Sequence, residues 1–205
     1  MPQPPDRPGA ADPGDKDLWR ARLLAARAAV PVATRAKEAA ALTAHLRAAV
    51  LPGLAPGQTL AAFLPVGDEP GSAALLDAAH DAGLTVIAPL TGPPGPLDWA
   101  RYRGADRLVT ARYGLAEPDG PALGPAALAA AAVVLVPALA VDRRGVRLGR
   151  GAGYYDRTLP RARPGARLIT VVRDEELVDR LPADPHDVPM TAALTPGGGL
   201  ITLGR

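Results

Sequence analysis

The sequence predicts an α/β fold, a three-layer α/β/α domain built around a mostly parallel, Rossmann-like sheet. Two observations favour this fold. Short apolar runs bounded by proline and glycine alternate with longer segments of helical character, as expected where helices connect parallel strands. The hydrophobic fraction of 48% is enough for a substantial core, and 205 residues fit one domain. We expect residues 1–14, which are rich in proline, glycine and aspartate, to be a disordered tail before a single domain over 15–205.

Helix signals come first along the chain. Asp15 is a suitable N-terminal cap for a helix that runs to about Ala29, and Pro31 separates it from a second helix that ends near Val50. A strand, a helix and a second strand are then expected over residues 60–64, 72–82 and 84–88. Gly83 is the stop signal of that helix. This order is typical of parallel strands joined by helices.

The second half contains the clearest buried strand, the apolar run at residues 133–136. Asp174 is the expected cap of a short helix near its end. In chain order, the other predicted elements are a strand over 97–102, a helix over 126–131, a short helix over 153–159, a strand over 168–172, the helix over 175–180, and closing strands over 190–194 and 200–203.

Composition excludes several classes of protein. The chain has no cysteine, so disulfides, thiolate metal sites and a cysteine nucleophile are ruled out. Its 23 basic and 21 acidic residues leave a net charge of +2, which does not call for a nucleic-acid partner. No apolar run approaches the roughly 18 residues of a membrane helix, and the first residues lack the apolar centre of a signal peptide. We therefore expect a cytoplasmic enzyme without a membrane segment.

The segment at residues 142–157 carries the strongest functional signal. This segment follows an apolar run and contains five arginines, four glycines, two adjacent tyrosines and the acids Asp142 and Asp156. Glycines let backbone N–H groups approach an anion, arginines add forked donors, and an aspartate can hold a metal ion. The spacing matches neither the dinucleotide fingerprint nor a P-loop. The pattern predicts a site for a phosphorylated ligand; the alternative is a surface turn with solvated arginines.

Other charged residues could complete such a site. Lys16 and Arg20 share one face of the first helix and could clamp distal phosphates, or could simply form a solvated basic face. Glu69, with Asp68 in a loop after a predicted strand, could bind an amide-like ring edge, or could belong to an acidic turn. Asp187 could join Asp156 on a hard cation such as Mg²⁺.

At these residues the sequence resembles the 5-formyltetrahydrofolate cyclo-ligase family. The resemblance rests on the string Arg-Leu-Gly-Arg-Gly-Ala-Gly-Tyr-Tyr-Asp at 147–156, which is highly specific; Ala152 departs from the glycine or lysine usual there. Supporting matches are residues 16–20, Phe63 and Leu64 with Glu69, residues 113–118, and residues 181–187. The resemblance implies ATP-dependent conversion of 5-formyltetrahydrofolate to 5,10-methenyltetrahydrofolate, with ATP and reduced folate as partners, Mg²⁺ as cofactor and a monomeric protein.

The resemblance also implies roles for individual residues. Arg150, Arg147 and Lys16 would be catalytic, and Asp156 and Asp187 would bind Mg²⁺. The residues implied in ATP binding are Lys16, Arg20, Arg147, Leu148, Gly149, Arg150, Gly151, Ala152, Gly153, Tyr154 and Tyr155. The residues implied in folate binding are Leu64, Glu69, Arg150 and Tyr154. Three rival functions stay open: a non-catalytic folate-binding protein, an unrelated nucleotide or phosphosugar binder on a similar sheet, and an RNA-binding module.

Overall fold

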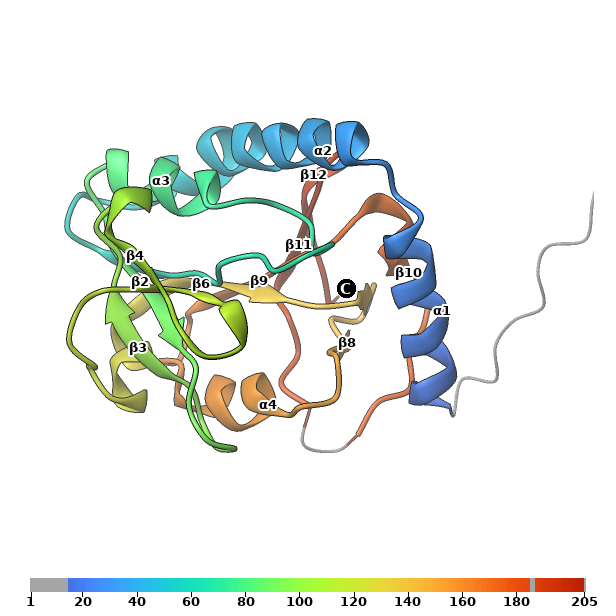
Figure 1. Cartoon of the computed structure of the whole chain (residues 1–205). Helices are drawn as coiled ribbons and strands as arrows, with labels where there is room; N and C mark the ends of the chain where they lie inside the picture. The colour runs from blue at the N-terminus through green and yellow to red at the C-terminus, as the bar shows by residue number, and fades with distance from the viewer. Residues whose placement is uncertain (1–14, 185–186, 205) are drawn as a thin grey trace, which may run out of the picture.

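The computed structural model describes residues 15–184 and 187–204, so the expected tail at 1–14 lies outside the described residues. Within these residues, a seven-stranded sheet has the strand order β12-β11-β9-β6-β1-β2-β3 (Figure 1). Its strands are β1 (Thr59–Ala61), β2 (Thr85–Leu90), β3 (Asp98–Arg101), β6 (Ala131–Pro137), β9 (Arg167–Val171), β11 (Ala192–Thr195) and β12 (Gly199–Thr202). The inner strands pair in parallel, and only β3 and β12, at the two edges, pair antiparallel. The predicted mostly parallel α/β sheet is confirmed.

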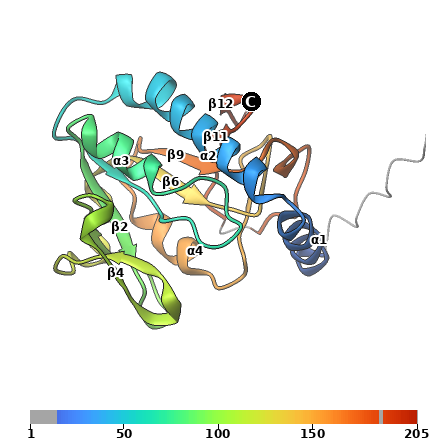
Figure 2. The ribbon, with the colours of Figure 1, turned by 45° about the horizontal axis from the view of Figure 1, so that its top comes forward.

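Helices cover both faces of this sheet. The α-helices are α1 (Lys16–Ala28), α2 (Val32–His45), α3 (Ala74–Asp81) and α4 (Tyr154–Thr158). Helices α2 and α3 lie over one face and α4 lies under the other (Figures 1 and 2). The expected cap of α1 is confirmed, because the Asp15 carboxylate accepts hydrogen bonds from the backbone N–H groups of Asp17 and Leu18. None of the described helices has the length and apolar character needed to cross a membrane.

The core lies on the two faces of the sheet, and β6 shows why. Its side chains alternate in direction, so Val133 and Leu135 pack with the layer under α2 and α3, whereas Val134 and Val136 pack with the opposite layer. Because both faces are covered, the strand is apolar throughout, which is what made it the clearest strand in the sequence.

Several smaller elements surround the main sheet. The strands β7 (Ala140–Asp142), β8 (Arg147–Leu148) and β10 (Leu177–Val178) form a second sheet, and β4 (Leu108–Thr110) pairs with β5 (Ala116–Pro118). A π-helical turn (Leu46–Val50) extends α2. Short 3₁₀ turns occur at Leu51–Gly53, Ala105–Arg107, Arg112–Gly114, Pro125–Ala130, Leu159–Arg161 and Asp174–Glu176. The glycine-rich loop therefore follows the β7–β8 hairpin, not β6 directly as the sequence suggested.

The prediction of a helix over 175–180 is wrong. The Asp174 carboxylate accepts hydrogen bonds from the Thr195 hydroxyl and from the backbone N–H groups of Gly197 and Gly198, so it holds the β11–β12 turn instead of capping a helix. The helix expected over 126–131 is a 3₁₀ turn, Pro125–Ala130. The strand expected over 60–64 is shorter, because β1 ends at Ala61. Phe63 then packs in the core.

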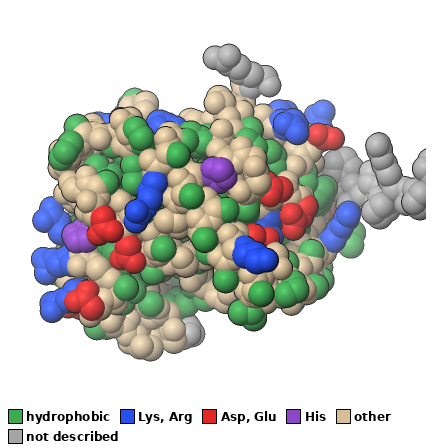
Figure 3. All heavy atoms as spheres, turned by 90° about the horizontal axis from the view of Figure 1, so that it is seen from above, with side chains coloured by type: hydrophobic (Ala, Val, Ile, Leu, Met, Phe, Trp, Pro, Cys, Tyr) green, Lys and Arg blue, Asp and Glu red, His purple; other side chains and the backbone are tan. Residues whose placement is uncertain are grey.

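Surface charge on one face is mixed. Figure 3 shows this face of the molecule, that of α2 and α3, with basic and acidic side chains interspersed. This pattern agrees with the net charge of +2. It gives no support, on this face, to the rival RNA-binding function, which calls for a continuous basic surface.

Candidate active site

A cavity of about 370 Å³ opens at the carboxyl ends of β1, β2 and β6, where open α/β sheets bind ligands. Segments that follow these strands meet the glycine-rich loop there. Its lining is largely apolar and comprises Phe63, Leu64, Val66, Glu69, Pro89, Leu90, Thr91, Leu97, Leu115, Ala116, Glu117, Pro137, Ala138, Arg147, Gly149, Arg150, Gly151, Ala152, Gly153, Tyr154, Tyr155 and Asp156. We call it the apolar cavity.

A second pocket, of about 120 Å³ and lined mainly by charged groups, adjoins the first. It is lined by Lys16, Arg20, Arg147, Leu148, Gly149, Gly151, Asp156, Asp184 and Asp187. We call it the polar pocket. Arg147, Gly149, Gly151 and Asp156 line both spaces, so the glycine-rich loop and its neighbours form their common wall.

The loop follows its path because of two left-handed glycines. Gly151 has φ +100° and Gly153 has φ +71°, which side chains rarely adopt. A Cβ atom at Gly153 would lie only 2.6 Å from Arg157 Nη1. Two arginines fix the loop from either side: Arg20 Nε donates to the Gly149 carbonyl at 3.1 Å, and Arg157 Nη2 donates to the Ala152 carbonyl at 2.8 Å. The backbone of the loop is thus held in one conformation by these hydrogen bonds.

Helix α1 brings its basic residues to this loop. Leu23 and Arg27 are its buried residues, and Leu23 packs with Leu139 and Leu148 of the β7–β8 region. Lys16 and Arg20 precede these positions at helical spacing, so they point to the same side of the helix. The predicted proximity of Lys16 and Arg20 to the glycine-rich loop is observed.

The acidic residues of the polar pocket are paired with its cations. Lys16 Nζ lies 2.5 Å from Asp184 Oδ2 and 3.6 Å from Asp187 Oδ2. Arg147 Nη2 donates to Asp156 Oδ1. Asp156 and Asp187 therefore line one pocket, as a shared cation would require. Asp184, which the sequence reasoning did not single out, lines it too.

The acidic residues of the polar pocket supply some, but not all, of the ligands that Mg²⁺ needs. Across residues 15–184 and 187–204, no group of three or more His, Cys, Asp or Glu side chains is arranged to hold a metal ion. A complete protein cage is thus lacking in this part of the chain. Mg²⁺ commonly uses only one or two carboxylates and takes its other ligands from water and substrate phosphates. The pair Asp156 and Asp187 fits that mode of binding.

Arg150 joins the loop to the segment after β1. Its Nε lies 3.1 Å from Glu69 Oε1 and its Nη2 lies 2.9 Å from Asp68 Oδ1. All four residues implied in folate binding, Leu64, Glu69, Arg150 and Tyr154, line the apolar cavity. The Tyr154 hydroxyl donates to the Gly92 carbonyl at 3.2 Å, which fixes its ring at the wall.

The residues implied in ATP binding divide between the two spaces. Those that line the polar pocket are Lys16, Arg20, Arg147, Leu148, Gly149 and Gly151. Those that line only the apolar cavity are Arg150, Ala152, Gly153, Tyr154 and Tyr155. Leu148 is also a buried core residue, so its backbone and not its side chain is suited to face a polar ligand.

Burial changes the electrostatics of the common wall. Burial lowers the pKa of Arg147 from its ordinary value, and the nearby Asp156 carboxylate opposes that shift. Burial raises the pKa of the Tyr155 hydroxyl, and Glu69 raises it further. Within the described part of the chain, this hydroxyl is buried and has no hydrogen-bond partner. Tyr155 thus keeps its proton at neutral pH and remains an available donor.

The structure gives two acidic residues, Asp142 and Glu117, roles that the sequence did not predict. Asp142 is fully buried and accepts hydrogen bonds from the backbone N–H groups of Arg144, Val146 and Leu181, so it organises the hairpin and is not a ligand group. Glu117 was missed as a site residue. It is buried on β5, accepts from Thr91 N at 2.5 Å and lines the apolar cavity. The one sequence signal for Glu117 was that it lies in residues 113–118, which resemble the cyclo-ligase family.

The fold and these paired spaces define an α/β enzyme with room for an apolar ring system beside an anionic group. Comparisons with known proteins extend this. A sequence model of the 5-formyltetrahydrofolate cyclo-ligase family matches residues 13–196. The chain is 48% identical over 196 residues to a 5-formyltetrahydrofolate cyclo-ligase of Mycolicibacterium smegmatis, covering 93% of this chain and 98% of that protein. It is 31% identical over 156 residues to the enzyme of Escherichia coli K12, covering 75% and 86%.

Solved structures share the fold. The 5,10-methenyltetrahydrofolate synthetase of Aquifex aeolicus superposes with a TM-score of 0.75 at 23% identity, covering 93% of each chain. The 5,10-methenyltetrahydrofolate synthetase of Mycoplasma pneumoniae superposes with a TM-score of 0.69 at 19% identity, covering 87% of this chain and 97% of that one. The chain belongs to the 5-formyltetrahydrofolate cyclo-ligase family, and it is an enzyme of that family.

Proposed function

We propose that this enzyme converts 5-formyltetrahydrofolate and ATP to 5,10-methenyltetrahydrofolate, ADP and phosphate, with Mg²⁺ as its cofactor. The observation that carries the proposal is the common wall. Arg147, Gly149, Gly151 and Asp156 line both the apolar cavity and the polar pocket. A group bound in one space is therefore next to a group bound in the other, as transfer between two substrates requires.

The two substrates are assigned by chemistry. The pterin ring of the folate belongs in the apolar cavity, where Leu64 and Tyr154 offer apolar contacts and Glu69 offers an acceptor to ring N–H groups. The triphosphate belongs in the polar pocket, where Lys16, Arg20 and Arg147 supply positive charge. Mg²⁺ held by Asp156 and Asp187 would neutralise phosphate charge there. The acids now paired with these cations would exchange partners when the anion binds.

The chemistry explains why ATP is needed. The formyl oxygen of an amide is a poor leaving group. Transfer of the γ-phosphoryl group to that oxygen forms an O-phosphorylated iminium ion at N5 and releases ADP. Folate N10 then attacks the formyl carbon, the C–O bond breaks to release phosphate, and the N10 proton is lost to give the methenyl bridge. Each step balances without an oxidant or reductant.

The residues act chiefly by positioning and by stabilising charge, as in other phosphoryl transfers. Arg150 lies on the glycine-rich loop between Gly149 and Gly151, which line both spaces, and its own side chain lines the apolar cavity beside Glu69. Its guanidinium would therefore meet the transferring group from the side of the folate. Arg147, buried at the common wall, adds a second positive charge. Lys16 would hold the phosphates from the side of α1.

The proposal is tested by mixing the purified enzyme with 5-formyltetrahydrofolate, ATP and Mg²⁺ and following the ultraviolet absorbance of the methenyl product. We expect product only when all three components are present. Product that forms at the same rate without ATP would contradict the proposal. We also expect a cytoplasmic monomer, which size-exclusion chromatography with light scattering would check for the oligomeric state.

Calorimetry distinguishes the proposed enzyme from the rival function, a non-catalytic folate-binding protein. Titration with 5-formyltetrahydrofolate alone would give binding for both functions. Adding Mg-ATP should give turnover heat for an enzyme and no additional heat for a binder. A nucleotide or phosphosugar binder without folate activity would show no folate binding at all.

A further inference from the structure

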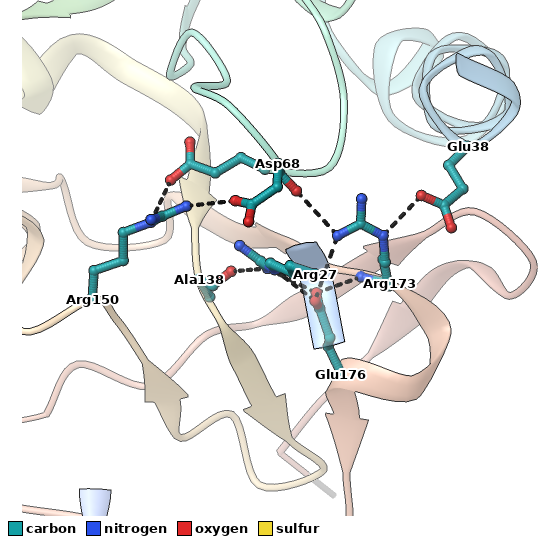
Figure 4. A network of polar contacts seen from close by, with 8 residues as sticks. Arg27, Glu38, Asp68, Ala138, Arg150, Arg173 and Glu176 are labelled. Carbon is teal, nitrogen blue, oxygen red and sulfur yellow. Dashed lines mark hydrogen bonds and ion pairs between the residues drawn. The ribbon is translucent and has the colours of Figure 1, made fainter. Parts of the chain in front are cut away.

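Three buried charged side chains that the proposed reaction does not use, Arg27, Arg173 and Glu176, form a network next to the apolar cavity (Figure 4). Arg27 and Arg173 are each 1% exposed and Glu176 is 2% exposed. Arg27 belongs to α1, Arg173 follows β9 and directly precedes the 3₁₀ turn Asp174–Glu176, and Glu176 ends that turn. Charged side chains are almost never buried to this degree unless they are paired, so their arrangement calls for an explanation.

Arg27 and Glu176 form the first part of the network. Arg27 Nε and Nη2 donate to the two Glu176 carboxylate oxygens at 2.6 and 2.8 Å, a bidentate pair. Arg27 Nη2 also donates to the Ala138 carbonyl at 2.5 Å. Ala138 lines the apolar cavity at the end of β6. This arm of the network therefore ends on the backbone of the cavity wall.

Arg173 forms the second part. Its Nε donates to Glu38 Oε2 of α2 at 2.8 Å, and its Nη1 donates to the Asp68 backbone carbonyl at 3.1 Å. The Asp68 carboxylate in turn accepts from Arg150 Nη2 at 2.9 Å. Figure 4 shows Asp68 between the two arginines, with its carbonyl toward Arg173 and its carboxylate toward Arg150. Asp68 thus links Arg173 to Arg150.

Stability alone does not account for this arrangement. Removing charges from water costs as much as a buried ion pair regains in many proteins, so such pairs are weak evidence for stabilisation. Arg173 Nη2 is buried and, among the described residues, has no hydrogen-bond partner, which adds to the cost. What the network does achieve is geometric, because both of its arms end on backbone carbonyls beside the apolar cavity.

We propose that Arg173 is a positioning residue that holds the Asp68–Glu69 turn, and through this turn sets the position of Arg150. The proposal rests on the proposed function, because it assigns Arg173 to the placement of the group that stabilises phosphoryl transfer. Arg173 reaches no ligand itself. A rigid guanidinium fork is suited to this task, because it bonds Glu38 and the Asp68 carbonyl from different nitrogens at fixed angles.

Arg173→Lys is the direct test, because lysine keeps the positive charge but cannot bond both partners in this geometry. We expect kcat to fall by about 10-fold or more, as for other small misplacements of catalytic groups, with the KM for ATP within about twofold of wild type. In the Arg150→Ala background the same substitution should change kcat by less than about twofold, because the residue being positioned is gone.

Glu38→Gln is the matched control. It removes the negative charge that pairs with Arg173 on α2, but the amide oxygen can still accept from Arg173 Nε and the bond to the Asp68 carbonyl remains. We therefore expect a lower melting temperature, while kcat stays within about twofold. If Arg173→Lys does not fold, the double variant Arg173→Gln with Glu38→Gln replaces it. That pair leaves no unpaired charge, and the same loss of kcat is expected.

A folded Arg173 variant with wild-type kcat would overturn the positioning role, and so would an equal loss of kcat with and without Arg150. The wild-type enzyme is assayed in parallel. Its activity distinguishes failure of the positioning role from failure of the proposed function. If the wild-type enzyme forms no methenyl product, the proposed function is rejected and the positioning role is rejected with it.

Discussion

Arg150 Nε lies 3.1 Å from Glu69 Oε1, although the two residues are 81 positions apart in the chain. The contact joins the glycine-rich loop to the segment after β1, and both side chains line the apolar cavity. A residue expected to stabilise the transferring phosphoryl group is therefore in direct contact with a residue expected to bind the folate. This contact gives a physical route by which folate binding can influence phosphoryl transfer.

Arg150→Ala should lower kcat by at least about 10-fold, because it removes the arginine that we propose stabilises phosphoryl transfer. Glu69→Gln should raise the KM for folate and lower kcat, and the double variant should lose less than the product of the single losses. Steady-state kinetics on the four proteins measures the coupling. Arg143→Ala is the control, since Arg143 forms an ion pair with the exposed Asp179 and lines neither space. Strictly multiplicative losses would exclude the coupling.

Asp187→Asn should raise the Mg²⁺ concentration needed for half-maximal rate by about 10-fold or more, because an amide is a weaker ligand than a carboxylate. The measurement is a Mg²⁺ titration of the initial rate at saturating ATP and folate. Asp179→Asn, on an exposed side chain, should leave the titration unchanged. An Asp187→Asn protein with the wild-type Mg²⁺ dependence would show that Asp187 is not a ligand of the proposed Mg²⁺ site.

Asp142→Asn should lower the free energy of unfolding by about 3 kcal/mol, because the amide cannot accept all the hydrogen bonds that the buried carboxylate receives. These come from three backbone N–H groups and the Arg144 guanidinium. Urea unfolding with an unchanged m-value measures the effect. Asp81→Asn, from an exposed pair with Arg47, should cost no more than about 0.5 kcal/mol. Equal losses in the two variants would contradict the structural role of Asp142.

Asp174 gives a prediction about pH. Desolvation acts to raise the pKa of this carboxyl, but the Thr195 hydroxyl and the backbone N–H groups of Gly198 and Gly197 outweigh it, so the pKa is lowered from its ordinary value. The folded state therefore favours the charged form. Its stabilising effect is complete above the unfolded pKa of about 3.9 and is lost as pH falls through the lower folded pKa.

Asp174→Asn should consequently be less stable than wild type at neutral pH, and the difference should shrink below about pH 4. Urea unfolding at a series of pH values measures it. A difference that stayed constant down to about pH 2 would mean that the Asp174 charge does not stabilise the β11–β12 turn.

Local signals predicted much of the fold. The Asp15 cap and the apolar run of β6 are visible in the sequence because capping and two-sided burial each leave a mark on neighbouring residues. The Asp174 prediction failed because the partners of this carboxylate lie on a turn 21 to 24 residues further along the chain. A cap residue looks the same in sequence whether it binds its own turn or a distant one.

The site was predictable to a similar extent. The string at 147–156 identified the loop, because its glycines and arginines are contiguous. The partners of that loop are not local: Arg150 meets Asp68 and Glu69, and Arg27 meets Glu176 at a separation of 149 residues. Glu117 was missed because one buried carboxylate on a short strand has no distinctive neighbours in sequence. Only the fold brings such residues together.

The central claim is that the phosphoryl group passes from the polar pocket across the common wall to the formyl oxygen. The most direct measurement uses 5-formyltetrahydrofolate labelled with ¹⁸O in the formyl group, unlabelled ATP and unlabelled water, with mass spectrometry of the released phosphate. The account predicts one ¹⁸O atom in each phosphate, because the formyl oxygen leaves bound to phosphorus. Unlabelled phosphate, with the ¹⁸O found in water, would contradict it.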